Sequence, residues 1–303
     1  MTKTIVACLL VGLFLGQPVE GHTYTHSKVL KVLSYNIQGL PWPFALTAKR
    51  FKDIGKVLEQ RKKDGTAPDL VLLQESFIPK TKDLRKYADY PYVAKGPGLC
   101  ARMNTGRIAC ALGNSGIYIL SLHPIVKQAR TGFSKKHCGT ADCWANKGVQ
   151  MALIAPEGLP FQIPIFNTHM QANDPYEADR IAQNSIIKTF LDEKNPEDLP
   201  FIFAGDFNFR PNLQSFHDFV QKTGLLDVGQ FCLNPGQTEC KIEEHSVPGE
   251  VFGGTVDHHF IRNVEGAEYS IQPIYVEKNF KEPINGRMPS DHEGYEVHYE
   301  IRW

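Results

Sequence analysis

The stretch VLSYNIQGLPW, residues 32–42, begins with the apolar pattern of a buried strand and then changes to the polar residue Asn36 and a Gly-Leu-Pro-Trp turn. An asparagine at the end of a single strand is ordinarily a turn former whose side chain bonds to nearby backbone. The other strand-like segments of the chain therefore decide whether Asn36 has a further role.

Short apolar runs of the same kind recur along the chain. Their β-branched and aromatic content, together with their short length, favours strands over helices. The runs are VLKVLSYN (29–36), DLVLLQE (69–75), GIYILS (116–121), VQMALI (149–154), IPIFNTHM (163–170), PFIFAGDFN (200–208), TVDHHFIR (255–262), IQPIYVE (271–277) and YEVHYEIRW (295–303). Many strands with helical segments between them at wide spacing predict two packed sheets flanked by helices.

Three segments between these runs have helical patterns. The first spans residues 47–65, with Thr47 as the cap and a glycine at the end. The second begins at Asp174, with Pro175 in the first turn and Glu177 as the glutamate of a capping box. The third is expected over residues 211–224, from a proline to a glycine.

The bulk composition is that of a globular protein with a substantial core. The 303 residues are 42% hydrophobic and 22% charged. Lys plus Arg and Asp plus Glu are both 33, so the formal net charge is zero. A neutral chain argues against a protein whose affinity depends on a large basic footprint for nucleic-acid phosphates.

Residues 1–21, MTKTIVACLLVGLFLGQPVEG, have the three-part pattern of a secretory signal peptide. Lys3 precedes an apolar run from Ile5 to Leu15, and this run is too short for a membrane-spanning helix, which needs about 20 residues. We therefore expect a secreted or periplasmic protein. No linker or repeat divides residues 22–303, which predicts a single domain.

Six cysteines follow the predicted signal peptide. An even number in an exported chain favours disulfides, and no spacing matches a zinc site. They fall into three close pairs, which is the simplest of the 15 possible connectivities, with free buried thiols as the alternative. The pairs are Cys100 with Cys110, Cys138 with Cys143, and Cys232 with Cys240.

Several of the apolar runs finish in residues that can bind metals or transfer protons. Polar strand ends are common, but six such ends in one chain suggest that they meet at one edge of the sheets. Like charges gathered there would need a cation to offset their repulsion. The ends are Asn36, Gln74-Glu75, Asn167-Thr168-His169, Gly205-Asp206-Phe207-Asn208, Asp257 and Ser290-Asp291-His292.

At this point the chain resembles the endonuclease/exonuclease/phosphatase superfamily, which contains deoxyribonuclease I-like nucleases, inositol polyphosphate phosphatases and neutral sphingomyelinases. The matching motifs follow the family order over almost all of the chain after residue 21. They are SYN (34–36), QES (74–76), SGIYILS (115–121), NTH (167–169), GDFN (205–208), VDHHF (256–260) and SDH (290–292). The resemblance implies a four-layer α/β sandwich and metal-dependent cleavage of phosphate esters.

The resemblance and the needs of the chemistry together assign metal ligands. Glu75 is the leading candidate, because a hard dication such as Mg²⁺, or Mn²⁺ or Co²⁺ in its place, prefers carboxylate oxygen. Asn36 would orient Glu75 or contact the metal, and Asp291 would lie nearer the metal than Asp257. His292 is the candidate general base, because an imidazole titrates nearest to neutral pH, and Asp257 would hold its tautomer. The two aspartates could exchange these roles.

The remaining candidates would act on the phosphate. Asp206 and Asn208, two apart on an extended segment, would project to the same side and position the water or the phosphate. His169 would donate to the phosphate or to the leaving oxygen. Lys147 could contact the phosphate, with a solvated surface lysine as the alternative.

One departure from the family pattern concerns His169. Deoxyribonucleases of the superfamily carry a glutamate that pairs with the counterpart of this histidine, in the strand where this chain has Gly116-Ile117-Tyr118. No acid stands there, so the nuclease interpretation is weakened and His169 has no obvious partner.

Three segments favour a sphingomyelinase C-like phosphodiesterase that acts on a phospholipid head-group ester. They resemble sphingomyelinase sequences and are NKGVQMALI (146–154), NTHMQAND (167–174) and SGIYILSLHPI (115–125). Peripheral contact with a membrane surface would follow, with Trp42, Phe44 and Leu46 forming an apolar lip or packing into the core. The alternatives are a secreted deoxyribonuclease I-like endonuclease, an inositol-phosphate phosphatase and a non-catalytic binding protein. No feature indicates an obligate protein partner.

Overall fold

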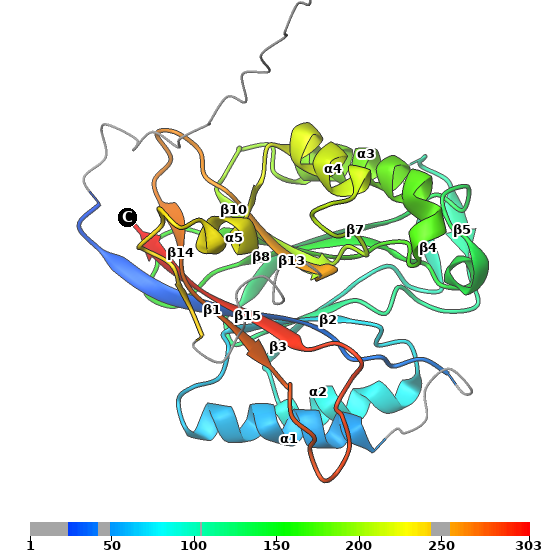
Figure 1. Ribbon diagram of the computed structural model, residues 1–303, viewed down its shortest axis with the longest axis horizontal. Helices are drawn as coiled ribbons and strands as arrows, with labels where there is room; N and C mark the ends of the chain where they lie inside the picture. Colours follow the sequence, from blue (N-terminus) through cyan, green and yellow to red (C-terminus); the bar gives the residue numbers. More distant parts are fainter. Residues whose placement is uncertain (1–23, 42–48, 104, 244–254) are drawn as a thin grey trace, which may run out of the picture.

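The computed structural model describes residues 24–41, 49–103, 105–243 and 255–303. Two mixed β-sheets lie face to face across a shared apolar interior (Figure 1). In spatial order, the seven-stranded sheet contains β12 (Lys241–Ile242), β14 (Ser270–Asn279), β15 (Gly294–Arg302), β1 (Ser27–Asn36), β2 (Leu70–Gln74), β6 (Tyr118–Ser121) and β3 (Tyr92–Lys95). The six-stranded sheet contains β11 (Leu226–Asp227), β13 (Asp257–Arg262), β10 (Phe201–Asp206), β9 (Ile163–His169), β8 (Gly148–Ile154) and β7 (Ile125–Gly132).

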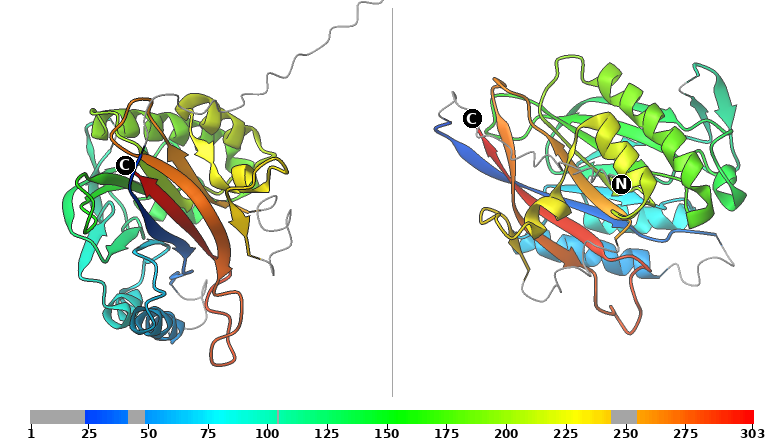
Figure 2. Two further views of the ribbon diagram at one scale, coloured as in Figure 1. Left: turned by 90° about the vertical axis from the view of Figure 1, so that its left-hand side faces the viewer. Right: turned by 45° about the horizontal axis from the view of Figure 1, so that its top comes forward.

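Helices cover the outer face of each sheet, and Figure 2 shows the resulting layers from the side. Helices α1 (Arg50–Lys63) and α2 (Lys82–Ala88) pack on the seven-stranded sheet. Helices α3 (Glu177–Lys194) and α4 (Gln214–Thr223) pack on the six-stranded sheet, and the short α5 (Val228–Leu233) contacts β13 and β14. The predicted four-layer α/β sandwich is therefore confirmed.

The layers follow from the period-2 alternation of the strands. In β2, Leu70 and Leu72 face the opposite sheet, whereas Val71 and Leu73 face the layer of α1 and α2. Because both faces of a central strand are covered, its residues read as a continuous apolar run. None of the helices in the described ranges is long and apolar enough to span a membrane.

The predicted helix ends are confirmed only in part. Thr47 lies outside the described residues, and α1 begins at Arg50. The capping box at Glu177 is wrong: residues 174–176 form a 3₁₀ turn, and the Glu177 carboxylate instead accepts from the backbone N–H of Ser215 at 2.9 Å, in the first turn of α4. A glutamate near the start of one helix can accept equally well from the first turn of a neighbouring helix, because the first N–H groups of every helix lack an intrahelical acceptor. Helix α4 begins three residues after Pro211 and ends at Thr223, with the predicted Gly224 as its C-cap.

The three predicted disulfides are present, as Cys100–Cys110, Cys138–Cys143 and Cys232–Cys240. The first joins the paired strands β4 (Cys100–Arg102) and β5 (Ile108–Cys110), which form a separate hairpin. The second closes a loop around the 3₁₀ turn Thr140–Trp144. The predicted signal peptide (1–21) and the proposed lip at Trp42, Phe44 and Leu46 lie outside the described residues.

The polar strand ends meet at one edge of the sandwich. Strands β1 and β2 run parallel with Asn36 opposite Gln74, and β9 and β10 run parallel with His169 opposite Asp206. Asp257 is opposite Asp206 but lies at the start of the antiparallel β13, not at a strand end as the sequence suggested. Residues 290–292 likewise precede β15, which is antiparallel to β1. An antiparallel strand begins where its neighbour ends, so these residues still reach the same edge.

Gly205 allows β9 and β10 to approach at this edge. A Cβ at this position would lie 2.3 Å from the carbonyl oxygen of Thr168 and 2.9 Å from its amide nitrogen.

Gly205→Ala should therefore lower the free energy of unfolding by about 3 kcal/mol or more, measured by urea denaturation. Gly65→Ala is the control, since Gly65 has φ 70° but open space, and strain alone should cost about 1 kcal/mol. Equal losses in the two variants would contradict the close approach.

Candidate active site

Asn36 connects the two sheets at the polar edge. Its amide nitrogen donates to the Asp206 carboxylate at 2.9 Å, and its amide oxygen accepts from the backbone N–H of Gln38 at 2.9 Å. The asparagine is thus a turn former and a site residue at once. Its hydrogen bond to Asp206 also makes it a link between β1 and β10, which belong to different sheets.

Two clusters of acidic and imidazole groups share Asp206. The first joins Glu75, His169 and Asp206, and the second joins Asp206, Asp257 and His292. In each cluster the potential ligand atoms lie within 4.8 Å of one another. His169 Nε2 is 3.6 Å from Asp206 Oδ2 and 3.9 Å from Glu75 Oε1. These five sequence-predicted residues therefore converge as expected.

The first cluster suits a hard divalent cation. Burial, with contributions from neighbouring acids, raises the pKa of Glu75 to about 7 and that of Asp206 to about 6. Glu75 Oε2 is buried and has no hydrogen-bond partner among the described residues. A cation between the two carboxylates would satisfy this oxygen and favour both charged forms. The donor set therefore fits a Mg²⁺ site built on Glu75 and Asp206.

His292 and Asp257 form the second half of the site. His292 Nδ1 lies 2.8 Å from Asp257 Oδ2. Burial opposes the imidazolium, but the charge and hydrogen bond of Asp257, together with Asp206 and Asp291, outweigh it and raise the pKa of His292 to about 10. The sequence argument that an imidazole titrates near neutral pH therefore does not hold for this histidine in the metal-free protein, where the acids around it stabilise its charged form.

The structure separates the two aspartates that the sequence left interchangeable. Asp257 contacts His292, whereas Asp291 is exposed and accepts from Gln38 Nε2 at 2.7 Å and from Ser290 Oγ at 3.2 Å. Among the described residues, Asp291 belongs to neither cluster. Its negative charge still acts on the pKa values of Glu75 and His292.

Lys147 is the partner of His169 that the sequence did not supply. Its ammonium donates to His169 Nε2 at 2.9 Å, to Asp142 Oδ2 at 2.8 Å and to the Met170 carbonyl at 2.9 Å. The side chain is 6% exposed, so the alternative of a solvated surface lysine is wrong. All three ammonium protons are engaged within the protein, and a phosphate contact would have to replace one of these bonds.

His169 is held neutral by this arrangement. Burial, followed by the positive charges of Lys147 and His292, lowers its pKa well below 6.5. Its Nε2 accepts from Lys147, and its Nδ1 has no partner among the described residues. A neutral imidazole with Nε2 as an acceptor carries its proton on Nδ1. The proton that the sequence hypothesis assigned to phosphate binding is therefore not on the nitrogen that faces Glu75 and Asp206.

Asn208 reaches the site by a route that the sequence argument did not give. Strand β10 ends at Asp206, and Asn208 has φ 54°, so the two residues are not on one extended segment. The Asn208 backbone N–H donates to Asp206 Oδ1 at 3.0 Å, and its side chain donates to the Met170 carbonyl at 3.2 Å. A tight turn, rather than strand alternation, places Asn208 beside Lys147.

Two residues have roles that the sequence analysis did not assign. Gln74 Nε2 donates to Asn167 Oδ1 at 2.9 Å and joins the sheets behind Glu75. Asp142 fixes Lys147 and accepts from the backbone N–H of Ala172 at 2.7 Å. The sequence contained a signal for Asp142, because it is an isolated acidic residue: no Asp or Glu stands between Asp89 and Asp142. Gln74 was named among the polar strand ends, but its bond to the opposite sheet was not predicted, because a glutamine at a strand end is common.

Two cavities of different polarity flank the clusters. One, of about 520 Å³, extends from Glu75 and is lined mainly by apolar groups, including Phe77, Leu112 and Trp144. The other, of about 450 Å³, lies at His292 and Asp257 and is lined by Arg210, Thr255, Val256, Met288, Ser290, Asp291 and Glu293. A reacting group at Asp206 would therefore have an apolar cavity on one side and a largely polar one on the other.

Comparisons with known proteins agree with this geometry. The model of the endonuclease/exonuclease/phosphatase family matches residues 33–292. A protein of Drosophila melanogaster named "Putative neutral sphingomyelinase" is 25% identical over 259 residues, which are 80% of this chain and 55% of that protein. The chain thus spans about half the length of this curated relative.

Solved structures below 25% identity show the same fold. A mutant beta toxin of Staphylococcus aureus with bound magnesium ions has a TM-score of 0.63 at 18% identity, covering 89% of this chain and 99% of the toxin. Sphingomyelinase C of Streptomyces griseocarneus has a TM-score of 0.58 at 21% identity, covering 89% and 99%. D. rerio TDP2 in complex with a single-strand DNA product has a TM-score of 0.60 at 18% identity, covering 89% and 98%.

The raised pKa of Glu75 predicts a pH dependence of stability in EDTA. Between about pH 4.5 and 7 the folded protein retains a proton on Glu75 that the unfolded chain has released. The contribution of Glu75 to the free energy of unfolding should therefore fall as the pH rises through this window. Urea denaturation of the wild type and Glu75→Gln should show their stability difference moving in favour of the variant, and Mg²⁺ should reverse this trend. A difference that stays constant with pH would contradict the burial of Glu75.

Proposed function

Because this chain belongs to the endonuclease/exonuclease/phosphatase family, we propose that it is a magnesium-dependent phosphodiesterase that hydrolyses the head-group ester of a phospholipid, as a sphingomyelinase C does. The observation that carries the substrate class is the contrast between the two cavities. A phospholipid has an apolar alcohol on one side of its phosphodiester and a polar head group on the other, which matches the cavities at Glu75 and at His292.

The similarity to a protein named as a neutral sphingomyelinase supports the same substrate. The fold is shared with a protein crystallised with DNA, so a nuclease is the second candidate. An apolar cavity next to the metal-binding carboxylate does not favour a DNA backbone, which is charged and polar on both sides of each phosphate. The inositol-phosphate phosphatase and the binding protein lack a specific observation in their favour.

In the proposed reaction water attacks phosphorus, the bond from phosphorus to the oxygen of the apolar alcohol breaks, and the released alkoxide takes a proton from water. His292 takes the proton of the attacking water, and Asp257 holds the imidazole so that Nε2 faces the site. This role requires neutral His292. A bound Mg²⁺ would supply positive charge that lowers the pKa of His292 and neutralises the phosphoryl oxygens.

The other residues hold the reacting groups in place. Glu75 and Asp206 would hold the metal, and Asn36 orients Asp206 from the opposite sheet. Asn208 would donate to the phosphate. The ammonium of Lys147, buried against His169, places positive charge beside the phosphate, and Lys147 can exchange one of its three bonds for a phosphoryl oxygen. Each of these groups is fixed by packing before substrate arrives.

We further propose that the protein is exported. The pattern of residues 1–21 supports this, as do the three disulfides, which persist in oxidising compartments.

Turnover of sphingomyelin in detergent micelles, assayed beside plasmid DNA with and without EDTA, tests the activity. We expect phosphocholine release that EDTA abolishes, and little DNA cleavage. Glu75→Gln should lower turnover at least about a thousandfold because a metal-binding charge is lost, and His292→Ala should lower it about a hundredfold or more. Asp291→Asn is the matched control and should cost less than about tenfold, since Asp291 lies outside both clusters.

DNA cleavage without phosphocholine release would reject the lipid substrate in favour of the nuclease. Near-normal turnover in Glu75→Gln or His292→Ala would reject the assigned roles. If Asp291→Asn loses as much turnover as Glu75→Gln, Asp291 would be a metal ligand, as the sequence analysis expected.

A further inference from the structure

Four large apolar side chains protrude from one region of the molecule. Leu112 is 82% exposed, Ile108 71%, Trp144 57% and Leu99 56%, the highest values among large apolar residues in the described part of the chain. Three of them lie on or beside the β4–β5 hairpin, and Trp144 ends the 3₁₀ turn Thr140–Trp144. Such exposure of several apolar groups in one region marks an interaction surface.

The backbone that carries these side chains is fixed. The Asn146 side chain donates to the carbonyls of Gly98 and Leu99 at 2.9 and 2.8 Å, and the Gly113 backbone N–H donates to the Trp144 carbonyl at 2.8 Å. The disulfides Cys100–Cys110 and Cys138–Cys143 close the two segments. The apolar groups are therefore presented by a preorganised surface, which lowers the entropic cost of binding.

This surface is continuous with the candidate active site. Leu112 and Trp144 line the apolar cavity that extends to Glu75. A molecule in contact with the protruding side chains would thus lie at the mouth of the cavity in which the proposed substrate reacts.

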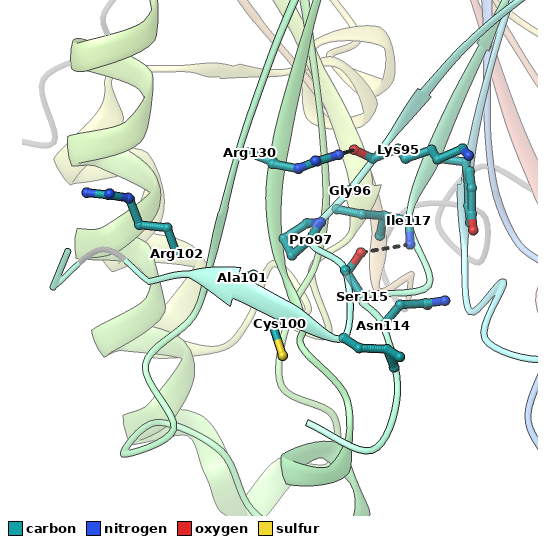
Figure 3. A pocket seen from close by; sticks show the side chains of 13 residues that line it. Lys95, Gly96, Pro97, Cys100, Ala101, Arg102, Asn114, Ser115, Ile117 and Arg130 are labelled. Atoms are coloured by element: carbon teal, nitrogen blue, oxygen red, sulfur yellow. Dashed lines mark hydrogen bonds between the residues drawn. The ribbon is translucent and has the colours of Figure 1, made fainter. Parts of the chain in front are cut away.

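The sequence segment that contains the hairpin is positively charged although the whole chain is neutral. Residues 90–141 contain seven Lys and Arg and no Asp or Glu. Figure 3 shows Arg102 on β4 directed away from Lys95 and Arg130, and the Arg130 guanidinium donates to the Lys95 carbonyl at 3.0 Å. Because Arg102 points away from Lys95 and Arg130, these three cations do not form a binding site for one anion.

We propose that Leu99, Ile108, Leu112 and Trp144 form a docking surface that inserts into the interface of a phospholipid membrane. Apolar groups combined with positive charge suit an interface in which phosphates lie above acyl chains. A second copy of this chain that docks through the same surface is a poorer partner, because two positive segments would repel each other. Nucleic acid would use the positive charge but not the leucine and isoleucine side chains. The inference rests on the proposed function for the choice of a lipid partner.

Vesicle binding in EDTA tests docking without requiring turnover. The protein is sedimented with sucrose-loaded vesicles of phosphatidylcholine, sphingomyelin and phosphatidylserine. Ile108→Asp combined with Leu112→Asp should weaken binding at least about tenfold, because two apolar contacts are lost and two carboxylates face lipid phosphates. Val29→Asp combined with Leu226→Asp adds the same two charges at exposed apolar positions on β1 and β11, outside residues 90–141, and should bind like the wild type.

A second measurement needs no charged variant. Bromine-labelled phosphatidylcholine should quench tryptophan fluorescence of the wild type, and Trp144→Phe should remove most of the quenched component.

Docking would be overturned by wild-type protein that stays in the supernatant, by equal binding of the two double variants, or by quenching that survives in Trp144→Phe. It would also be overturned if the wild type does not bind vesicles but forms a dimer in sedimentation velocity, and the Ile108→Asp and Leu112→Asp double variant is a monomer. Binding of the wild type to DNA but not to vesicles would overturn it as well. If vesicles bind as expected but sphingomyelin is not hydrolysed in Mg²⁺, the proposed activity fails and the docking surface stands.

Discussion

The buried carboxylate of Asp206 is the constraint on which the polar edge depends. A carboxylate in a dry interior is costly unless charges and hydrogen bonds compensate for it. Here Asn36 donates from the opposite sheet, the Asn208 backbone N–H donates from the following turn, and the charges of Lys147 and His292 oppose the rise in the Asp206 pKa. Because these partners come from both sheets, the site can form only when the sandwich is closed.

This constraint explains why polar groups replace apolar ones between the sheets at the polar edge. Between the sheets the inward positions of β2 are Leu70 and Leu72, but the next inward position is Gln74, which bonds to Asn167 of the other sheet. This hydrogen bond links the two sheets at one position, although the Gln74 amide oxygen is buried without a partner among the described residues. The cluster itself is destabilising without a cation, since burial raises the pKa values of Glu75 and Asp206. Stability given up at such a site is a common consequence of function.

The buried positive charge of Lys147 also requires a compensating partner. Lys147 is buried because Asp142 compensates for its charge, and Asp142 lies in the loop closed by Cys138–Cys143. The loop that fixes Lys147 also ends in Trp144 at the mouth of the apolar cavity. The short segment closed by this disulfide therefore supports the cluster of Glu75, His169 and Asp206 on its inner side and the proposed docking surface on its outer side.

The sequence by itself determined nine of the fifteen strands in the described residues, the disulfide pairs and most of the residues that meet at the polar edge. These follow from local properties: apolar alternation, close cysteine spacing, and polar residues at the ends of runs such as that before Asn36. Only the tertiary structure decided which groups pair. It placed Asp257 rather than Asp291 on His292, gave His169 a lysine partner, turned Glu177 to another helix and raised the pKa of His292. Pairing and pKa depend on distances between segments far apart in the chain and on burial, and no local pattern encodes either.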